Sequence, residues 1–337
     1  MAQPFHVVFP ALGTAFEVAV GPSATMGGSM AHHKPTHPDA LTGVARHCFH
    51  RIIGILDELV RDLSRWYPQS TVSQLAITGG QFTVPDYARP MFAAYKTAAD
   101  ITGGEVHPLI GATLRARGFH SDDHTPLAAP PHPTPALTAS TSIASPADIP
   151  QLTTDQHNQF FATLPTIALA PGQVIDIGAA GKGLAVDLIT EALIEELPID
   201  SDDTLLVNGS GDLRVVGGPI TIGLENPYNP AEILGVITLT EGSFAASSPA
   251  RRTHGKWHHL IGEISGNPAT LVDGAFVVAP TAMLADLAAT CCFFTHPENL
   301  TALGVTQWAV AAQEMLYSSP DFPVVEAPRT ADQGQHP

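Results

Sequence analysis

A run of twenty mostly apolar residues, AFVVAPTAMLADLAATCCFF (275–294), restricts the folds open to this chain more than any other feature. The run is long enough to cross a bilayer as a helix. However, Asp286 would then lie near the middle of the membrane, at a cost of roughly 3 kcal/mol. Pro280 also divides the run. The pattern therefore predicts a buried strand followed by a buried helix, and no membrane span.

Length and charge narrow the function. The chain has 337 residues, enough for one large domain or two smaller ones, and its 44% hydrophobic content excludes a wholly disordered chain. It carries 15 Lys and Arg against 32 Asp and Glu, a formal charge of −17. Such a field repels nucleic acid and anionic membrane surfaces. A ligand that carries phosphate must therefore be held locally, by a metal ion, backbone amides or a few placed cations.

The cysteines and the N-terminal segment bear on the compartment. Cys48, Cys291 and Cys292 form neither a disulfide framework nor a spacing typical of metal ligands. The segment MAQPFHVVFPALGT has no basic region of the kind that begins a secretory signal. We expect a reducing, cytoplasmic location.

Periodicity and composition outline the organisation of the chain. We expect one domain over residues 1–317, with loop insertions at about 22–40 and 120–150, and a flexible C-terminal tail at 318–337. His32, His33 and His37 in the first insertion could bind a metal, but a solvated loop is the simpler reading. Apolar spacing predicts helices at 41–63, about 86–101 and 184–197. Strands are predicted in pairs within 5–20, 161–178 and 205–217, and singly at 219–224 and 233–239.

Asp286 and Thr290 stand four residues apart on the predicted helix, which places a carboxylate and a hydroxyl on one face. Both are hard oxygen donors that suit Mg²⁺. The alternative is a helix cap or a hydrogen-bonded buried aspartate.

The segment DIGAAGKG (176–183) joins a strand to a helix. A helix N-terminus offers backbone amides and a positive dipole end to an anion, and Lys182 adds a charge. The spacing matches neither a P-loop nor GxGxxG. A tight turn without a ligand explains the segment equally well.

Two further segments carry side chains suited to chemistry. HGKWHHLIG (254–262) holds His258 and His259, which are candidate bases, and Arg251 and Arg252 precede it as candidate phosphate clamps. Trp66 follows the helix at 41–63 and could stack on an aromatic ring system. Structural histidines and ordinary core packing are the alternatives.

Taken together and in order, seven segments between about residues 9 and 304 resemble the ApbE family, the FAD:protein FMN transferases. They are LGT (12–14) beside the family's MGT, SRWYPQSTV (64–72) beside S-x-Y-x-x-x-S-x-[IV], GGEVHPLIGATL (103–114) beside GGAFDPTVGPL, DIGAAGKGLAVD (176–187) beside DLGGIAKGYAVD, VNGSGDLRVVG (207–217) beside a strand–GGD–strand element, SSPARR with HHLIGEISGNP (247–252 and 258–268) beside SGDYxR with HIIDPRTGxP, and LADLAATCCFF (284–294) beside ADALATALFV.

The resemblance implies an α+β fold, related to the T-fold, in which mixed sheets and flanking helices surround a flavin cleft. It implies Mg²⁺-dependent transfer of FMN from FAD, the substrate, to a Thr or Ser hydroxyl of an acceptor flavoprotein, with release of AMP. The metal positions are matched by Asp286, Thr290 and the carbonyl of Ala179. His259 matches the family base, and Arg252 is assigned beside it as catalytic. The positions that match FAD contacts are Leu12, Trp66, Glu105, Val106, His107, Asp176, Lys182 and Ile261.

The chain departs from the family pattern near the expected flavin and reacting phosphate. His107 and Gly262 stand where the family has Asp, Pro249 replaces the Gly of SGD, and Ala76 replaces an Asn. The alternative function is therefore a protein that binds FAD, or hydrolyses it to FMN and AMP, without modifying proteins. A third class is a catalytically silent flavin carrier. These classes differ in whether AMP release needs an acceptor protein, needs none, or does not occur.

Overall fold

The computed structural model describes residues 4–22, 36, 41–119, 154–199, 202–251, 253–254 and 257–326. Most of both predicted insertions lies outside these residues, as do His32, His33, His37 and Arg252.

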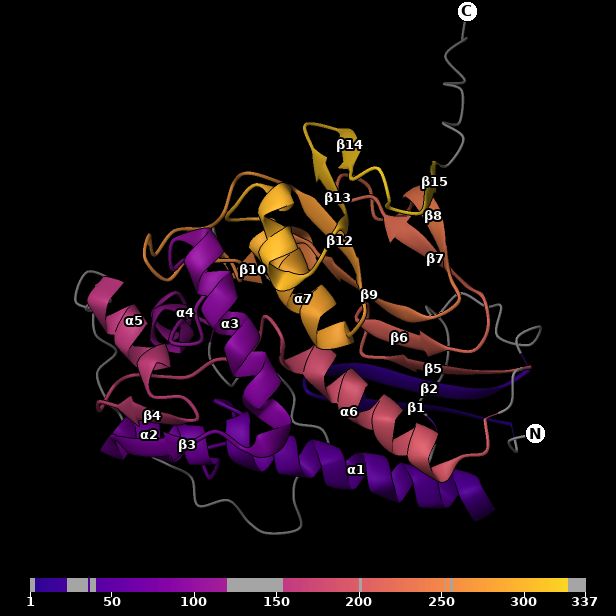
Figure 1. The fold of residues 1–337 in the computed structure, drawn as a ribbon, viewed down its shortest axis with the longest axis horizontal. Helices are drawn as coiled ribbons and strands as arrows, with labels where there is room; N and C mark the ends of the chain where they lie inside the picture. Colours follow the sequence, from indigo (N-terminus) through magenta and orange to yellow (C-terminus); the bar gives the residue numbers. More distant parts are fainter. Residues whose placement is uncertain are drawn as a thin grey trace, which may run out of the picture.

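An eight-stranded sheet forms the centre of the fold (Figure 1). Its strands, in spatial order, are β1 (Phe5–Ala11), β2 (Thr14–Pro22), β5 (Asp203–Asn208), β6 (Leu213–Val216), β9 (Gly242–Ser247), β12 (Gly274–Ala279), β13 (Gln307–Ala312) and β14 (Met315–Ser318). Every neighbouring pair is antiparallel. Among the described residues, parallel pairing occurs only in the isolated bridge between Ile110 and Val174.

Three smaller sheets complete the β structure. They are β15 (Val324–Glu326), β8 (Ile233–Leu239) and β7 (Ile220–Glu225) in that order, then β3 (Gly80–Thr83) with β4 (Thr166–Leu169), and β10 (Thr253–His254) with β11 (Trp257–His258). In β7, buried residues alternate with exposed ones over most of the strand, which is the pattern of a strand with one covered face. Strand β15 lies within the predicted C-terminal tail, so paired backbone extends past the expected boundary at residue 317.

The helices are α1 (Gly43–Leu63), α2 (Thr71–Thr78), α3 (Arg89–Thr102), α4 (Gly111–Ala116), α5 (Thr154–Ala162), α6 (Gly181–Glu196) and α7 (Ala282–Cys291), with 3₁₀ turns η4 (Asp86–Ala88), η7 (Pro249–Arg251) and η8 (Pro297–Leu303). Helix α1 buries Cys48, Ile52, Leu56, Leu59 and Leu63, which recur every three or four residues along one face. The three predicted helices are therefore confirmed in type and approximate position.

Two apolar cores lie on opposite faces of the large sheet. The larger core lies between that sheet and the helices, and it takes in residues of α1, α3, α6 and α7. The smaller core joins Phe244 and Phe276 of the large sheet to Ile222 and Ile237 of the three-stranded sheet. In Figure 1, α3, α6 and α7 lie on the helical side and β7, β8 and β15 on the other. Helix α7 contacts α3, α6, β9 and β12, so it is enclosed.

The apolar run at 275–294 forms the predicted strand and helix. Strand β12 and helix α7 are joined through Pro280, and Thr281 caps the helix by accepting a hydrogen bond from the amide of Leu284 at 3.3 Å. None of the helices in the described part of the chain is long and apolar enough to cross a membrane.

Two local predictions were wrong. Of two strands expected within 161–178, only β4 forms, because Phe161 belongs to α5 and residues 174–178 run as a non-strand segment toward α6. Helix α6 begins at Gly181, three residues before the prediction, since the amide of Gly181 already bonds to the carbonyl of Ile177 at 2.7 Å. The glycines that favoured a turn thus belong partly to the first turn of the helix.

Candidate functional site

Asp176 lies buried just before α6 and anchors one side of the candidate site. Its Oδ1 accepts a hydrogen bond from the amide of Gly178 at 2.6 Å, and its Oδ2 pairs with the guanidinium of Arg65. Both side chains are less than a tenth exposed. The Arg65 guanidinium also lies 3.4 Å from the centroid of the Trp66 ring. Arg65 therefore joins Asp176 and Trp66, two residues predicted to contact flavin.

Helices α6 and α7 hold each other through two aspartates. Asp286 of α7 accepts a hydrogen bond from the amide of Gly183, in the first turn of α6, at 3.2 Å. In return, Asp187 of α6 accepts from the amides of Ala282 and Met283, at the start of α7, both at 2.9 Å. A side chain at Gly183 would overlap the backbone of α7, because its Cβ would lie 2.6 Å from the Met283 nitrogen. Close packing of the two backbones is what brings Asp286 to the N-terminus of α6.

The three predicted cation ligands lie around this junction. Ala179 precedes α6 by one residue, Asp286 bonds to the first turn of α6, and Thr290 follows Asp286 by one turn on the same face of α7. Asp286 and Thr290 are both buried. A carboxylate, a hydroxyl and a carbonyl suit Mg²⁺, which normally completes its shell with water and ligand phosphates. No group of three His, Cys, Asp or Glu side chains in the described ranges is arranged as a metal site, so a cation here would rely on one carboxylate and neutral oxygens.

Tyr95 of α3 points into the same region. Its hydroxyl is buried and has no hydrogen-bond partner among the described residues. Burial, followed by the charges of Asp176 and Asp286, raises the pKa of Tyr95 well above its ordinary value, and the backbone of Ala179 opposes part of this shift. A buried hydroxyl without a protein partner is the kind of group that a ligand or its hydration shell satisfies, so the donor set at this junction fits a hydrated cation.

Cations near the site differ in how far they are neutralised. Lys182 pairs with the buried carboxylate of Asp212, so its charge is already compensated. Arg115 of α4 forms no ion pair within the described part of the chain, and its Nη2 donates to the carbonyl of Arg65 at 3.3 Å. Burial and then the charge of Arg65 lower the pKa of Arg115 below its ordinary value. An anion between these two arginines would relieve their repulsion.

An apolar cluster adjoins the arginines. It contains buried Leu114, Phe119 and Ile261, packed with Trp66, Ile110 and Trp257. Arg117 lies over the Trp257 ring at 4.2 Å. The structure thus brings Trp66 and Ile261, two predicted flavin contacts, into one cluster that could receive an aromatic ring.

Glu105 occupies the space that a side chain at position 262 would need. A Cβ added to Gly262 would overlap the Glu105 carboxylate, and it would lie 2.7 Å from Glu105 Cδ. Glu105 Oε2 accepts hydrogen bonds from the amide and the hydroxyl of Ser265, at 3.0 and 3.1 Å. A carboxylate is therefore present where the family pattern has Asp at 262, but it comes from residue 105.

Glu263 is a buried carboxyl that the sequence analysis did not single out. It is 5% exposed and accepts a hydrogen bond from the Thr113 hydroxyl at 3.0 Å. Burial, with a smaller contribution from the charge of Glu105, raises the pKa of Glu263 to about 8.

Three predicted flavin contacts lie in less open surroundings. Val106 is buried in the main core. The His107 ring is 2% exposed and lies 5.0 Å from the rings of both Phe160 and Phe161. Leu12 is half-buried in the β1–β2 turn with φ of 51°, a strained value for a branched side chain. Strain of this kind is typical of positions retained for function.

The two histidines of the predicted base differ in their surroundings. His258 Nε2 bonds to the carbonyl of Ala269 at 3.1 Å, and burial lowers the pKa of His258 below its ordinary value. His258 therefore anchors the segment as a neutral residue. His259 is half-buried on the loop after β11, and its carbonyl accepts from the amide of Ile261 at 3.0 Å. The predicted catalytic Arg252 lies outside the described residues.

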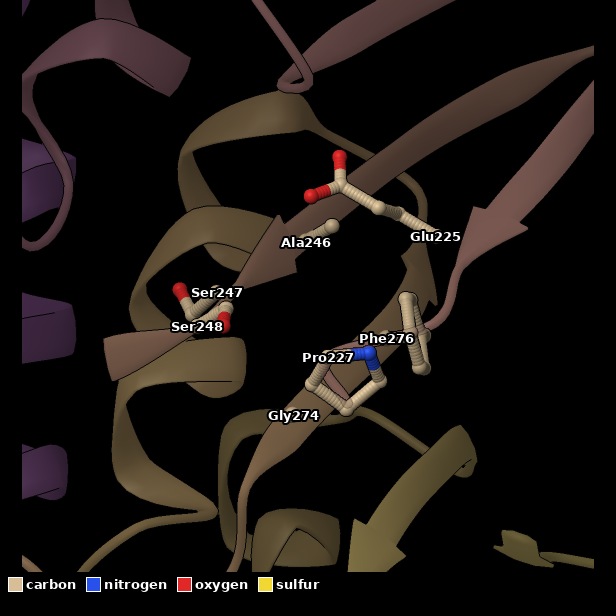
Figure 2. Close-up of a pocket in the computed structure, with 7 residues that line it drawn as sticks. All are labelled: Glu225, Pro227, Ala246, Ser247, Ser248, Gly274 and Phe276. Carbon is tan, nitrogen blue, oxygen red and sulfur yellow. The ribbon is translucent and has the colours of Figure 1, made fainter. Parts of the chain in front are cut away.

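A separate hollow lies at the ends of β7, β9 and β12 (Figure 2). Glu225, Ser247 and Ser248 supply its polar groups, and Phe276 belongs to the smaller core. None of the predicted site residues lines it.

Arg65 and Tyr95 are the main site residues that sequence reasoning missed. Arg65 stands directly before Trp66, and that adjacency was the one available signal. Tyr95 falls at helical spacing with the buried residues Met91, Ala98 and Thr102, so it reads as an ordinary core residue.

The geometry describes an α+β protein with a candidate nucleotide- and cation-binding site where α6 begins. A family model described as the ApbE family matches residues 12–312. The chain therefore belongs to the ApbE family. No curated protein matches the sequence.

Solved structures of similar fold come from three bacteria. The ApbE protein of Thermotoga maritima is 17% identical, with a TM-score of 0.66 over 94% of this chain and 97% of that one. The flavin transferase ApbE of Vibrio cholerae is 17% identical, with a TM-score of 0.64 over 96% and 100%. The flavinyl transferase ApbE of Pseudomonas stutzeri is 18% identical, with a TM-score of 0.65 over 95% of each chain. These similarities establish the shared fold and confirm the predicted fold class.

Proposed function

We propose that this chain transfers FMN from FAD to a Thr or Ser hydroxyl of an acceptor flavoprotein, releases AMP, and requires Mg²⁺. Membership of the ApbE family and a fold shared with proteins named as flavin transferases support the proposal. The observation that carries it is the convergence at α6 of matched residues from distant segments, above all the pairing of Asp176 with Arg65 and the bond from Gly183 to Asp286. We further propose that the protein acts in the cytoplasm.

Binding would be divided between two neighbouring parts of the site. The cluster of Trp66 and Ile261 would take the flavin ring, since aromatic rings stack and exclude water there. Arg115 would contact a phosphate oxygen, because its charge is not paired with a carboxylate among the described residues. Asp286, Thr290 and the Ala179 carbonyl would hold Mg²⁺, which when bound neutralises charge on the transferred phosphate.

The chemistry assigned to the protein is positioning and proton transfer. The acceptor oxygen forms a bond to the FMN phosphorus as the bond from that phosphorus to the AMP oxygen breaks. His259 would take the proton of the acceptor hydroxyl, while the anchored His258 fixes the segment. Arg252 remains a proposed catalytic residue beside it.

The experiment is incubation with FAD and Mg²⁺, with and without an acceptor protein, followed by mass spectrometry of the acceptor and measurement of AMP. Flavin on the acceptor, with AMP released only in its presence, is expected. AMP release without an acceptor would favour the hydrolase alternative, which the His107 and Gly262 departures suggest. Binding of FAD with no AMP release would indicate a carrier.

A pair of variants tests the cation site. Asp286→Asn retains an acceptor for the Gly183 amide but removes the charge, so Mg²⁺-dependent transfer should be lost. Asp187→Asn is the matched control, because Asp187 is a buried aspartate on the adjoining helix whose amide and Arg214 contacts are structural. Full Mg²⁺-dependent activity in Asp286→Asn would refute the site.

A further inference from the structure

Tyr95 holds a buried hydroxyl that the family resemblance does not explain. The residue is 1% exposed, and its Oη has no hydrogen-bond partner among the residues that the structure describes. Leaving a buried hydroxyl without a partner is unfavourable, because the group loses its bonds to water and gains none. By contrast, the hydroxyl of Tyr87, at the 3₁₀ turn before the same helix, donates to Asp62 at 3.0 Å.

The surroundings of Tyr95 Oη are the groups assigned to the cation. Its charged carboxylate neighbours are Asp176 and Asp286, and the backbone of Ala179 lies beside it. Helix α3, which carries Tyr95, packs on α7, which carries Asp286. The hydroxyl therefore reaches the junction of α6 and α7 from a third element.

We propose that Tyr95 is a positioning residue of this site, whose hydroxyl hydrogen-bonds to a water ligand of a bound divalent cation. The inference rests on the proposed function, because it takes Asp286, Thr290 and Ala179 as the cation ligands. Three protein oxygens leave an octahedral cation with water or phosphate at its other positions. Groups that hold such outer ligands orient the shell, and their loss typically weakens metal binding about 10- to 100-fold.

The test uses Mn²⁺ alone, without flavin, titrated into the full chain and followed by the electron paramagnetic resonance signal of the free ion. Tyr95→Phe removes only the hydroxyl, and we expect its Kd for Mn²⁺ to rise about 10- to 100-fold. Tyr87→Phe removes a hydroxyl that is bonded elsewhere, and its Kd should equal that of the wild type.

Thermal unfolding of the metal-free proteins gives the second readout. Tyr95→Phe should melt at the same temperature as the wild type or higher, because it deletes an unpaired buried group. The stabilisation by added Mn²⁺ should shrink. A hydroxyl with a purely structural role would instead lower the metal-free melting temperature and leave the Mn²⁺ affinity unchanged.

The outcomes separate this inference from the proposed function. If the wild type binds Mn²⁺ and Tyr95→Phe binds it equally well, the role of Tyr95 is refuted while the cation site stands. If the wild type binds no Mn²⁺ and Asp286→Asn transfers flavin normally, the cation site and the inference both fail.

Discussion

Replacing Glu263 with glutamine is expected to remove a pH dependence from the stability of the fold. The wild-type carboxyl is buried, and its pKa is raised from an ordinary 4.5 to about 8, mainly by burial. Between these values the unfolded chain has lost the proton while the folded chain keeps it. Folding therefore binds a proton, and the free energy of unfolding falls as pH rises from about 4.5 to about 8.

The size of the effect follows from the shift. At about 1.4 kcal/mol per pH unit, a change from 4.5 to about 8 corresponds to at most roughly 5 kcal/mol. Reorganisation around the ionised carboxylate, including the Thr113 hydroxyl that bonds to it, reduces the expected loss to about 2–4 kcal/mol. Glutamine has similar shape and does not ionise in this range, so the variant lacks this contribution.

Urea denaturation at pH 5 and pH 8 measures the difference. The wild type should lose about 2–4 kcal/mol more than Glu263→Gln between the two pH values. Glu241→Gln is the control, because Glu241 is exposed, and its pH dependence should match that of the wild type. Equal losses in the wild type and Glu263→Gln would refute the assignment of a buried neutral carboxyl.

Three further outcomes test the site. Gly262→Asp should destabilise the protein by about 1–3 kcal/mol, because its Cβ would overlap Glu105, and adding Glu105→Ala should restore much of the loss; no restoration would contradict the steric argument. FAD should quench tryptophan fluorescence less in Trp66→Phe than in the wild type, and an unchanged quench would place the flavin elsewhere. His259→Ala should slow transfer ~10²–10⁴-fold with little change in FAD affinity, whereas His258→Ala should chiefly lower the melting temperature; the reverse pattern would move the base to His258.

Local patterns were sufficient for most of the elements. The run at 275–294 became β12 and α7 because a charge and a proline exclude a membrane helix and permit a buried strand and helix. Helix α1 followed its apolar spacing closely. Predictions failed where local signals overlapped, as at Gly181, where glycines typical of a turn also form the first turn of α6.

The chemistry of the site residues could be read from the sequence, and their partners could not. Arg65 and Asp176 are 111 residues apart, and Asp286 and Gly183 are 103 apart, so no periodicity links them. The partner of Lys182 was equally hidden, since Asp212 lies on a different segment.

The sequence by itself determined the fold class, most elements and the family, because hydrophobic period and motif order are properties of the chain read locally. Only the tertiary structure decided which charges are neutralised and which are not. It pairs Lys182 with Asp212, places the Glu105 carboxylate at Gly262, and leaves the Tyr95 hydroxyl buried beside Asp286. The physical reason is that burial and electrostatic environment depend on how α3, α6 and α7 pack against one another, and that packing brings together groups that no local pattern relates.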